Sequence, residues 1–314
     1  MIEKVAVLGA GTMGHGIALA FAMHGYEVNV YEPDEVRRST ASQEIRCELE
    51  MLIEEGITDI SNFKKILDSI KMYDSLERAV QDRDYVIEAI PEILELKQDA
   101  FQKLDKLCPK ETIFSSNTSS LKLSDMMAKV SEERKKRIMI THWYNPAHII
   151  PIVELSFFGN TSEEVYREVE TLYKNIGKQV VKVLKDIPGL IANRIQQAIA
   201  REVFALMEMG AAEPADIDKA LTFGPAFRFA TSGLLQIADF GGLDIWCTVA
   251  DNLWKVLNNA TSVPEFLKEK VRQGKLGIKT REGFFNYKTV DIDQVRKQYI
   301  KKLIHQLKAS KYYY

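Results

Sequence analysis

Short apolar, β-branched runs alternate with longer segments of helical periodicity through roughly the first 185 residues of the chain. We expect strands at residues 5–8, 28–31, 85–90, 113–116, 138–142, 152–155 and 180–184. Strands that alternate with helices are typical of crossover connections, which build a parallel sheet with helices on both faces. The pattern therefore predicts an α/β fold whose N-terminal part is a doubly wound, mostly parallel sheet.

The periodicity changes after Gly189. Apolar side chains then recur at spacings of three and four, which predicts a long helix; they are Leu190, Ile191, Ile195, Ile199, Val203 and Leu206. Further helices are expected at residues 216–221, 234–257, 263–272 and 292–308. Because Pro188 and Gly189 separate the two patterns, we place a boundary there, with a sheet domain at residues 1–186 and an all-helical domain at residues 187–314.

The first helix of this second domain is apolar over too much of its circumference for a helix on a protein surface. Either its own domain or a second subunit must therefore cover it. We favour a homodimer formed through the helical domain.

The charge balance and the cysteines limit the classes of function. Forty-two Lys and Arg stand against 44 Asp and Glu, so no overall basic field gathers nucleic acid or anionic lipid. No apolar run approaches the roughly 18 residues that a membrane span needs. Three cysteines, far apart and without metal-ligand spacing, fit a reducing compartment, and we expect all three to be buried. The sequence predicts a cytoplasmic protein with a small-molecule ligand and no metal.

A glycine-rich segment links the first strand to a helical segment that begins at His15. It consists of Gly9, Ala10, Gly11, Thr12, Met13 and Gly14. The first glycine permits a tight turn, the second lets a pyrophosphate approach the backbone, and the third allows close packing of helix and strand. The N–H groups of the helix N-terminus then attract phosphate. The pattern predicts a Rossmann-type dinucleotide site.

Glu32 closes the next strand, at the spacing of a residue that hydrogen-bonds an adenosine ribose. Its charge would repel a 2′-phosphate, which favours NAD over NADP. Arg37 and Arg38 lie close in sequence and point the other way, although both are more simply placed on the solvated face of the next helix. We predict NAD as the cofactor.

A histidine and a glutamate mark the candidate chemistry. His142 ends a strand, and the carboxyl ends of parallel strands are where ligands bind. Glu154 is a carboxylate in the apolar run of the next strand, where an unpaired charge is costly. Such a pair is either a general base with a fixed tautomer or a structural contact. The other histidines have no obvious partner in the sequence: His15, His24, His148 and His305.

Six motifs resemble, in order, those of the 3-hydroxyacyl-CoA dehydrogenase family: residues 9–14, 91–97, 116–120, 142–154, 186–194 and 279–285. The resemblance covers nearly the whole chain. It implies NAD-dependent oxidation of the 3-hydroxyl of an (S)-3-hydroxyacyl-CoA, such as 3-hydroxybutyryl-CoA, in fatty acid metabolism. It implies that His142 is the base, that Glu154 orients it, and that Ser119 and Asn193 hold the substrate oxygens. The residues implied to border NAD are Glu92, Lys97, Ser119, Asn145 and Lys279.

The positions of Ser119 and Asn193 agree with those roles. Ser119 follows the strand at residues 113–116, so its hydroxyl lies at the sheet edge of His142; the alternative is an N-cap of the next helix. Asn193 lies in the first turns of the long helix, where an amide does not favour helix formation.

Two segments depart from the usual acyl-CoA enzymes. The resemblance places CoA along a helical hairpin at about residues 35–71, but its register falls on an acidic segment at residues 43–55, with Arg46, Lys64 and Lys65 as nearby cations. Residues 224–230 are similar to the branch of the family that includes lambda-crystallin, L-gulonate 3-dehydrogenase and carnitine dehydrogenase. There Arg228 would hold a free carboxylate, or else form a surface or interface ion pair.

Three other functions are alternatives to oxidation of an acyl-CoA. One is dehydrogenation of a free 3-hydroxy acid such as L-gulonate or L-carnitine. Another is a non-catalytic NAD-binding structural protein, which the joint presence of His142, Glu154, Ser119 and Asn193 disfavours. The third is a membrane-surface or nucleic-acid role for the basic tail at residues 296–311, whose apolar stripe more often docks on the body of a protein.

Overall fold

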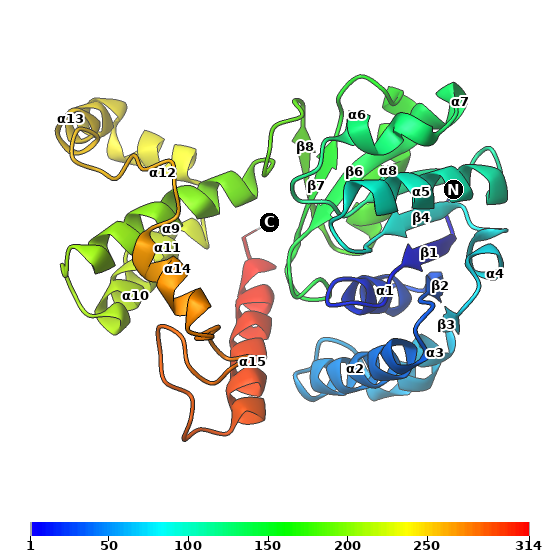
Figure 1. Ribbon diagram of the computed structural model, residues 1–314, viewed down its shortest axis with the longest axis horizontal. Helices are drawn as coiled ribbons and strands as arrows, with labels where there is room; N and C mark the ends of the chain where they lie inside the picture. The colour runs from blue at the N-terminus through cyan, green and yellow to red at the C-terminus, as the bar shows by residue number, and fades with distance from the viewer. Residues whose placement is uncertain (1, 314) are drawn as a thin grey trace. The chain divides into compact units, whose positions relative to one another are not determined.

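The computed structural model describes residues 2–313 of the chain. The chain divides into two compact units, Met1–Asn193 and Arg194–Tyr314. The first unit is an α/β unit and the second is all-helical (Figure 1). The predicted fold class, a Rossmann-type sheet domain with a helical C-terminal domain, is confirmed.

One eight-stranded sheet forms the centre of the first unit, in the order β3-β2-β1-β4-β5-β6-β7-β8. All neighbouring strands are parallel except β6 and β7. The order reverses direction after β1, and ligands bind at such a switch point in parallel sheets. The strands are β1 Lys4–Leu8, β2 Glu27–Tyr31, β3 Ile70–Tyr73, β4 Tyr85–Glu88, β5 Ile113–Ser116, β6 Ile138–Trp143, β7 Ile152–Ser156 and β8 Gln179–Val183.

All seven strands expected from the sequence are present, and β3 is a strand that the sequence did not predict. It lies at the edge of the sheet, where it pairs only with β2. None of its four residues is fully buried, and Lys71 is exposed. A short edge strand carries too little apolar pattern to be recognised.

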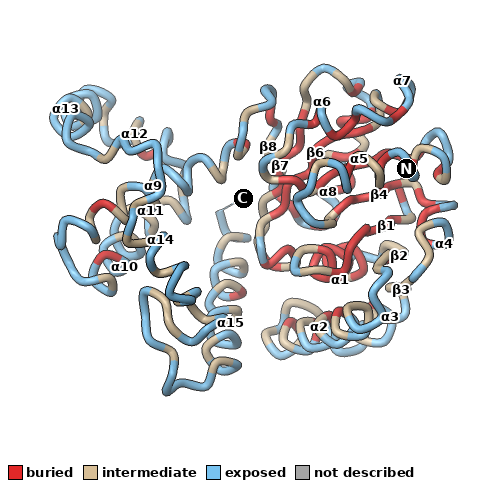
Figure 2. The backbone as a smooth tube through the Cα atoms, viewed as in Figure 1, coloured by how far each residue is buried: buried red, intermediate tan, exposed pale blue. Residues whose placement is uncertain are grey.

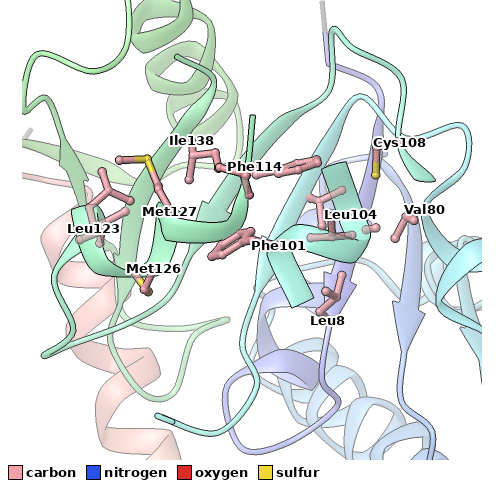
Figure 3. Close-up of a cluster of buried hydrophobic side chains, with 14 of the residues drawn as sticks. Leu8, Val80, Phe101, Leu104, Cys108, Phe114, Leu123, Met126, Met127 and Ile138 are labelled. Atoms are coloured by element: carbon pink, nitrogen blue, oxygen red, sulfur yellow. The ribbon is translucent and has the colours of Figure 1, made fainter. Parts of the chain in front are cut away.

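Helices cover both faces of this sheet. The side chains of Phe101 and Leu104 from α5 pack with Leu8 and Phe114 in a buried cluster on one face (Figure 3). On the other face, Phe21 of α1 packs against Tyr85, and buried residues concentrate around the strands (Figure 2). The helices are α1 Gly14–Met23, α2 Glu35–Glu54, η1 Ile60–Asn62, α3 Phe63–Asp68, α4 Leu76–Val80, α5 Leu94–Leu107, α6 Leu123–Met126, η2 Met127–Lys129, α7 Glu132–Lys135 and α8 Glu163–Asn175.

Helix α9, Ala192–Glu208, begins at the end of the first unit and continues in the second. The other helices of the second unit are α10 Pro214–Phe223, α11 Pro225–Phe229, α12 Leu234–Gly241, α13 Leu243–Leu253, α14 Glu265–Arg272 and α15 Ile292–Ser310. The single helical stretch predicted at residues 234–257 is wrong, because Gly242 breaks it. This residue has φ +88°, and a Cβ there would lie 2.7 Å from Oδ1 of Asp244. The helix α11 was not predicted.

Few side chains of the second unit are buried. Within α9 only Ala205 is buried, and α13 has no buried residue in the described part of the chain. The prediction that all three cysteines are buried is also wrong, since Cys47 and Cys247 are exposed and only Cys108 is buried. Among residues 2–313, no helix is both long and apolar enough to cross a bilayer.

Candidate active site

The glycine-rich loop lies between β1 and α1, as predicted. Gly9 has φ +92°, and a Cβ on Gly14 would lie 1.8 Å from the carbonyl oxygen of Gly9, so the fold itself requires both glycines. A Cβ on Gly11 would meet nothing within 4 Å. The protein's own packing therefore gives no reason for glycine there, whereas a ligand that approaches the backbone does. The loop fits the pyrophosphate of a dinucleotide.

Glu32 holds this loop from the end of β2. Its Oε2 accepts a hydrogen bond from the N–H of Ala10 at 3.1 Å, and its Oε1 accepts one from the N–H of Asp34 at 3.1 Å. The carboxylate is therefore fixed beside the loop, and its predicted contact with the ribose of NAD stays a prediction.

Both arginines after Glu32 are partly exposed on α2, and both are hydrogen-bonded within the protein. Arg37 donates from Nε to the carbonyl oxygen of Ala10 at 2.7 Å and pairs with Glu44. Arg38 donates to the carbonyl oxygen of Glu32 at 2.7 Å. Both guanidinium groups are bound within the protein, which weakens the argument for a 2′-phosphate.

A buried ion pair joins the end of β4 to α5. The Nζ of Lys97 lies 2.7 Å from Oε1 of Glu88 and 3.2 Å from Oε2 of Glu92. The side chains of Glu88 and Lys97 are 0% and 1% exposed, and Ser116 donates to the other oxygen of Glu88 at 2.6 Å. A lysine in this position is held by the protein, and its predicted contact with NAD stays a prediction.

Glu92 organises the loop that follows β5. It accepts hydrogen bonds from the hydroxyl of Thr118 and from the N–H groups of Ser119 and Ser120. Burial acts to raise the pKa of Glu92, but the hydrogen bonds from the side chains of Thr118, Ser120 and Lys97, together with the charge of Lys97, outweigh it and lower the pKa to about 2. An ionised Glu92 thus fixes the backbone that carries Ser119.

Ser119 is partly exposed and lines a pocket with Ile140 and Pro188. It is not an N-cap, because the next helix, α6, begins at Leu123. Its predicted role toward substrate and NAD stays a prediction, as does that of the exposed Asn145.

His142 and Glu154 face each other across β6 and β7. The antiparallel register pairs these two residues directly, and Nδ1 of His142 lies 2.8 Å from Oε2 of Glu154. The other oxygen, Oε1, accepts the N–H groups of Ile191 and Ala192 at 2.9 Å each. Burial acts to raise the pKa of Glu154, but the hydrogen bonds from His142, Ala192 and Ile191 hold it below its usual value.

An ionised Glu154 requires a proton on Nδ1 of His142. In the neutral ring, Nε2 then carries a lone pair. The hydrogen bond from Nδ1 to Glu154 fixes the orientation of the ring. Such an imidazole can accept the proton of an alcohol.

Tyr144 is a site residue that sequence reasoning missed. Its hydroxyl donates to Oδ1 of Asn193 at 2.8 Å, and its ring packs edge-on against His142 with centroids 5.2 Å apart. The oxygen of the Asn193 amide is therefore occupied, which leaves its NH₂ group as a donor for another oxygen. Burial raises the pKa of Tyr144 to about 12, with the charge of Glu154 acting in the same direction, so this hydroxyl keeps its proton.

Two of the histidines that had no obvious partner in the sequence lie beside the same carboxylate in the structure. Nε2 of His15 lies 3.0 Å from Oε1 of Glu48, and Nδ1 of His148 lies 3.3 Å from Oε2 of the same carboxylate. No sequence signal links these residues, because Glu48 is on α2, far from both.

Arg228 and Lys279 belong to the second unit, and both are exposed. Their predicted contacts with substrate and with NAD stay predictions.

Two protein-family models match the chain. Residues 4–187 match "3-hydroxyacyl-CoA dehydrogenase, NAD binding domain", and residues 189–287 match "3-hydroxyacyl-CoA dehydrogenase, C-terminal domain". Together the two matches cover more than half of the chain.

Individual relatives carry different substrate names. The chain is 31% identical to a 5-formyl-3-hydroxy-2-methylpyridine 4-carboxylate 5-dehydrogenase of Mesorhizobium japonicum, over 97% of both chains. It is 32% identical to a probable 3-hydroxybutyryl-CoA dehydrogenase of Bacillus subtilis, over 91% of this chain and 98% of the other. It is 28% identical to an L-carnitine dehydrogenase of Oceanobacillus iheyensis, over 96% and 97%. A solved structure named for the pyridine carboxylate enzyme, an NAD⁺-dependent dismutase, superposes with a TM-score of 0.91 at 30% identity, over 99% of both chains.

Proposed function

This chain belongs to the 3-hydroxyacyl-CoA dehydrogenase family, and from that premise we propose that it oxidises the 3-hydroxyl of a small free hydroxy acid, with His142 as the base. It is an NAD-dependent dehydrogenase. Bound NAD supplies the hydride acceptor for the reaction. The 2.8 Å contact of His142 with Glu154 supports the role of the base, because it leaves Nε2 as the acceptor for the hydroxyl proton.

The residues around the developing ketone follow from the same geometry. The NH₂ group of Asn193, oriented by Tyr144, and the hydroxyl of Ser119 are proposed to donate hydrogen bonds to the substrate oxygens. Glu154 holds the tautomer of His142 and stabilises the imidazolium that forms.

The charges on α2 and α3 favour a free acid over a CoA thioester. Arg46 lies over the ring of Phe63, and the exposed Lys64 pairs with Asp68, so both are engaged within the protein. Of the three cations expected to compensate for the acidic segment, this leaves only Lys65, whose side chain forms no ion pair within residues 2–313. Acidic side chains at residues 43–55 would repel the phosphates of CoA.

The names of relatives support the same choice. A pyridine carboxylate and L-carnitine, the substrates in two of the names, are carboxylates without a CoA group. Arg228 is the proposed partner of such a carboxylate, because its guanidinium is exposed and pairs with no acidic side chain within residues 2–313. A charge-assisted bidentate pair would suit this role.

The test is a parallel assay with NAD against L-gulonate, L-carnitine and 3-hydroxybutyryl-CoA. We expect a free acid to have the highest kcat/KM. Because the bound substrate would bury its charge pair with Arg228, Arg228→Ala should lower kcat/KM by an amount corresponding to about 2–5 kcal/mol. Arg201→Ala, at an exposed arginine of α9, is the matched control and should have little effect. A higher kcat/KM for the thioester, with no Arg228→Ala defect, would overturn the proposal.

The second candidate is oxidation of a 3-hydroxyacyl-CoA in fatty acid metabolism. It is favoured by the Bacillus subtilis relative named as a probable 3-hydroxybutyryl-CoA dehydrogenase, which aligns over 98% of its length. The same parallel assay separates this candidate from the first.

We also propose a homodimer formed through the second unit. Its helices α11 to α13 expose large apolar side chains, including Phe227 at 68%, Leu235 at 83% and Phe240 at 81%. Monomeric proteins rarely expose so many large apolar side chains on neighbouring helices. The proposed partner is a second copy of this chain. The sequence analysis predicted that its own domain or a second subunit covers helix α9, and Ile195 of this helix is exposed within the single chain.

Light scattering on the purified protein tests the dimer. The wild type should have the mass of two chains, and Leu235→Asp combined with Phe240→Asp should shift it toward one. Val36→Asp, at an exposed apolar position on α2, is the matched control. A wild-type mass of one chain would refute the dimer.

We also propose that the protein is cytoplasmic, as expected from the sequence. Imaging of a tagged chain in cells would check this location.

A further inference from the structure

His15 lies in the first turn of α1, one residue after the glycine-rich loop. Its Nδ1 lies 2.7 Å from the carbonyl oxygen of Gly11, and its Nε2 lies 3.0 Å from Oε1 of Glu48. Both contacts are within hydrogen-bond distance. Because α1 and α2 lie side by side (Figure 1), the ring joins the dinucleotide loop to α2.

The two partners of His15 determine its protonation. A carbonyl oxygen and a carboxylate can only accept hydrogen bonds, so both ring nitrogens must carry a proton for both contacts to form. The ring is then an imidazolium with a full positive charge. It is 8% exposed, so this charge acts in partly desolvated surroundings.

The charged groups around the ring come from two other parts of the chain. From α2, Glu44 lies 3.5 Å from Nδ1, Glu48 contacts Nε2, and Arg37 pairs with Glu44. From the segment after β6, His148 lies 3.3 Å from the second oxygen of Glu48. The acidic groups nearest to His15 outnumber the cationic ones.

The charges of these groups favour the protonated ring. Burial acts to lower the pKa of His15, but the hydrogen bond and charge of Glu48, the bond to Gly11 and the charge of Glu44 outweigh it and raise the pKa. Burial lowers the pKa of His148 to about 4, and the charges of His15 and Lys178 act in the same direction. Of the two histidines beside Glu48, His15 is therefore the one whose contacts favour the protonated ring.

We propose that His15 is a positioning residue for the cofactor: its imidazolium attracts the diphosphate of NAD and anchors the loop, so affinity for NAD and NADH falls when His15 loses its proton. The carbonyl oxygen of Gly11 accepts both the backbone N–H of His15 and the ring N–H, so the side chain reinforces the turn that carries the loop. Glu48 acts through His15, by holding the ring in the protonated state. The proposal rests on NAD binding and does not depend on the substrate.

The direction with pH follows from the raised pKa. A histidine whose pKa is raised contributes its charge fully below its ordinary pKa of 6.5, and the contribution is lost as the pH rises through the raised value. NADH affinity should therefore weaken as the pH rises above the ordinary histidine pKa of 6.5.

The experiment is a fluorescence titration of NADH into the full chain without substrate, between about pH 6 and about pH 9. The wild-type Kd should rise about three- to tenfold over this range, the size of one charge interaction near a helix end. His15→Asn should bind NADH about three- to tenfold more weakly at the acidic end and show little pH dependence. Glu48→Gln should shift the wild-type transition to lower pH.

His24→Asn is the matched control. His24 lies at the other end of α1, and its Nδ1 contacts the carbonyl oxygen of Ala20 at 2.8 Å, but no carboxylate within residues 2–313 pairs with it. This variant should follow the wild-type titration. If His15→Asn fails to fold, the wild-type titration and Glu48→Gln still test the proposal. A pH-independent wild-type Kd, an unshifted transition in Glu48→Gln, or wild-type affinity and pH dependence in His15→Asn would overturn it.

Discussion

Replacing Glu154 with Gln changes one atom of a buried side chain and should remove the general base. Gln has one acceptor oxygen in place of two. If that oxygen stays with the N–H groups of Ile191 and Ala192, the amide NH₂ faces Nδ1 of His142. Nδ1 must then accept a hydrogen bond, so the ring proton moves to Nε2, the atom that must take the proton of the substrate.

The opposite orientation of the amide is unfavourable. It would keep the correct tautomer of His142 but direct NH₂ at the two backbone N–H groups, which would both lose their acceptor. Two buried, unpaired N–H groups cost roughly 2–6 kcal/mol. The orientation with the wrong tautomer therefore dominates in Glu154→Gln. Loss of a general base lowers the rate by about a hundred- to ten-thousandfold.

The assay is steady-state kcat at saturating NAD and substrate, beside NADH affinity measured by fluorescence. The kcat should fall while NADH affinity changes little. His142→Gln should show a similar loss, and the double variant should lose less than the product of the single losses, because the two residues act as a unit. Glu170→Gln, at the ion pair with Lys174 on α8, is the isosteric control. A kcat for Glu154→Gln near that of the control would refute the reasoning, as would fully multiplicative losses.

Three further predictions follow from the same geometry. Tyr144→Phe removes one hydrogen bond to Asn193 and should lower kcat/KM about two- to tenfold with unchanged NADH affinity; an equal loss in an Asn193→Ala background would contradict the proposed orientation of the amide. Glu32→Ser should reduce the ratio of kcat/KM with NAD to that with NADP, and strong wild-type turnover with NADP would rule out its role. Lys97→Met leaves the carboxylate of Glu88 buried and unpaired, so it should lower the free energy of unfolding in urea by about 3–5 kcal/mol; a change below about 1 kcal/mol would mean that the pair is dispensable.

The amino-acid sequence was sufficient for features that depend on local pattern. The seven recognised strands are short apolar runs, and the glycines after β1 meet the backbone demands of a strand-to-helix turn. His142 and Glu154 could be found because they lie on strands that follow one another along the chain. Their pairing needed only that β6 and β7 become neighbours.

The tertiary structure decided what lies between segments that the sequence keeps apart. The contact between His15 and Glu48 spans 33 positions, and that between Tyr144 and Asn193 spans 49. Periodicity shows which face of a helix or strand is buried, but not which neighbour that face meets or where a polar side chain on it points. The sequence therefore predicted a base and its orienting partner, whereas the folded chain determined which residues hold the amide and the cofactor loop, because side-chain direction depends on packing between distant elements.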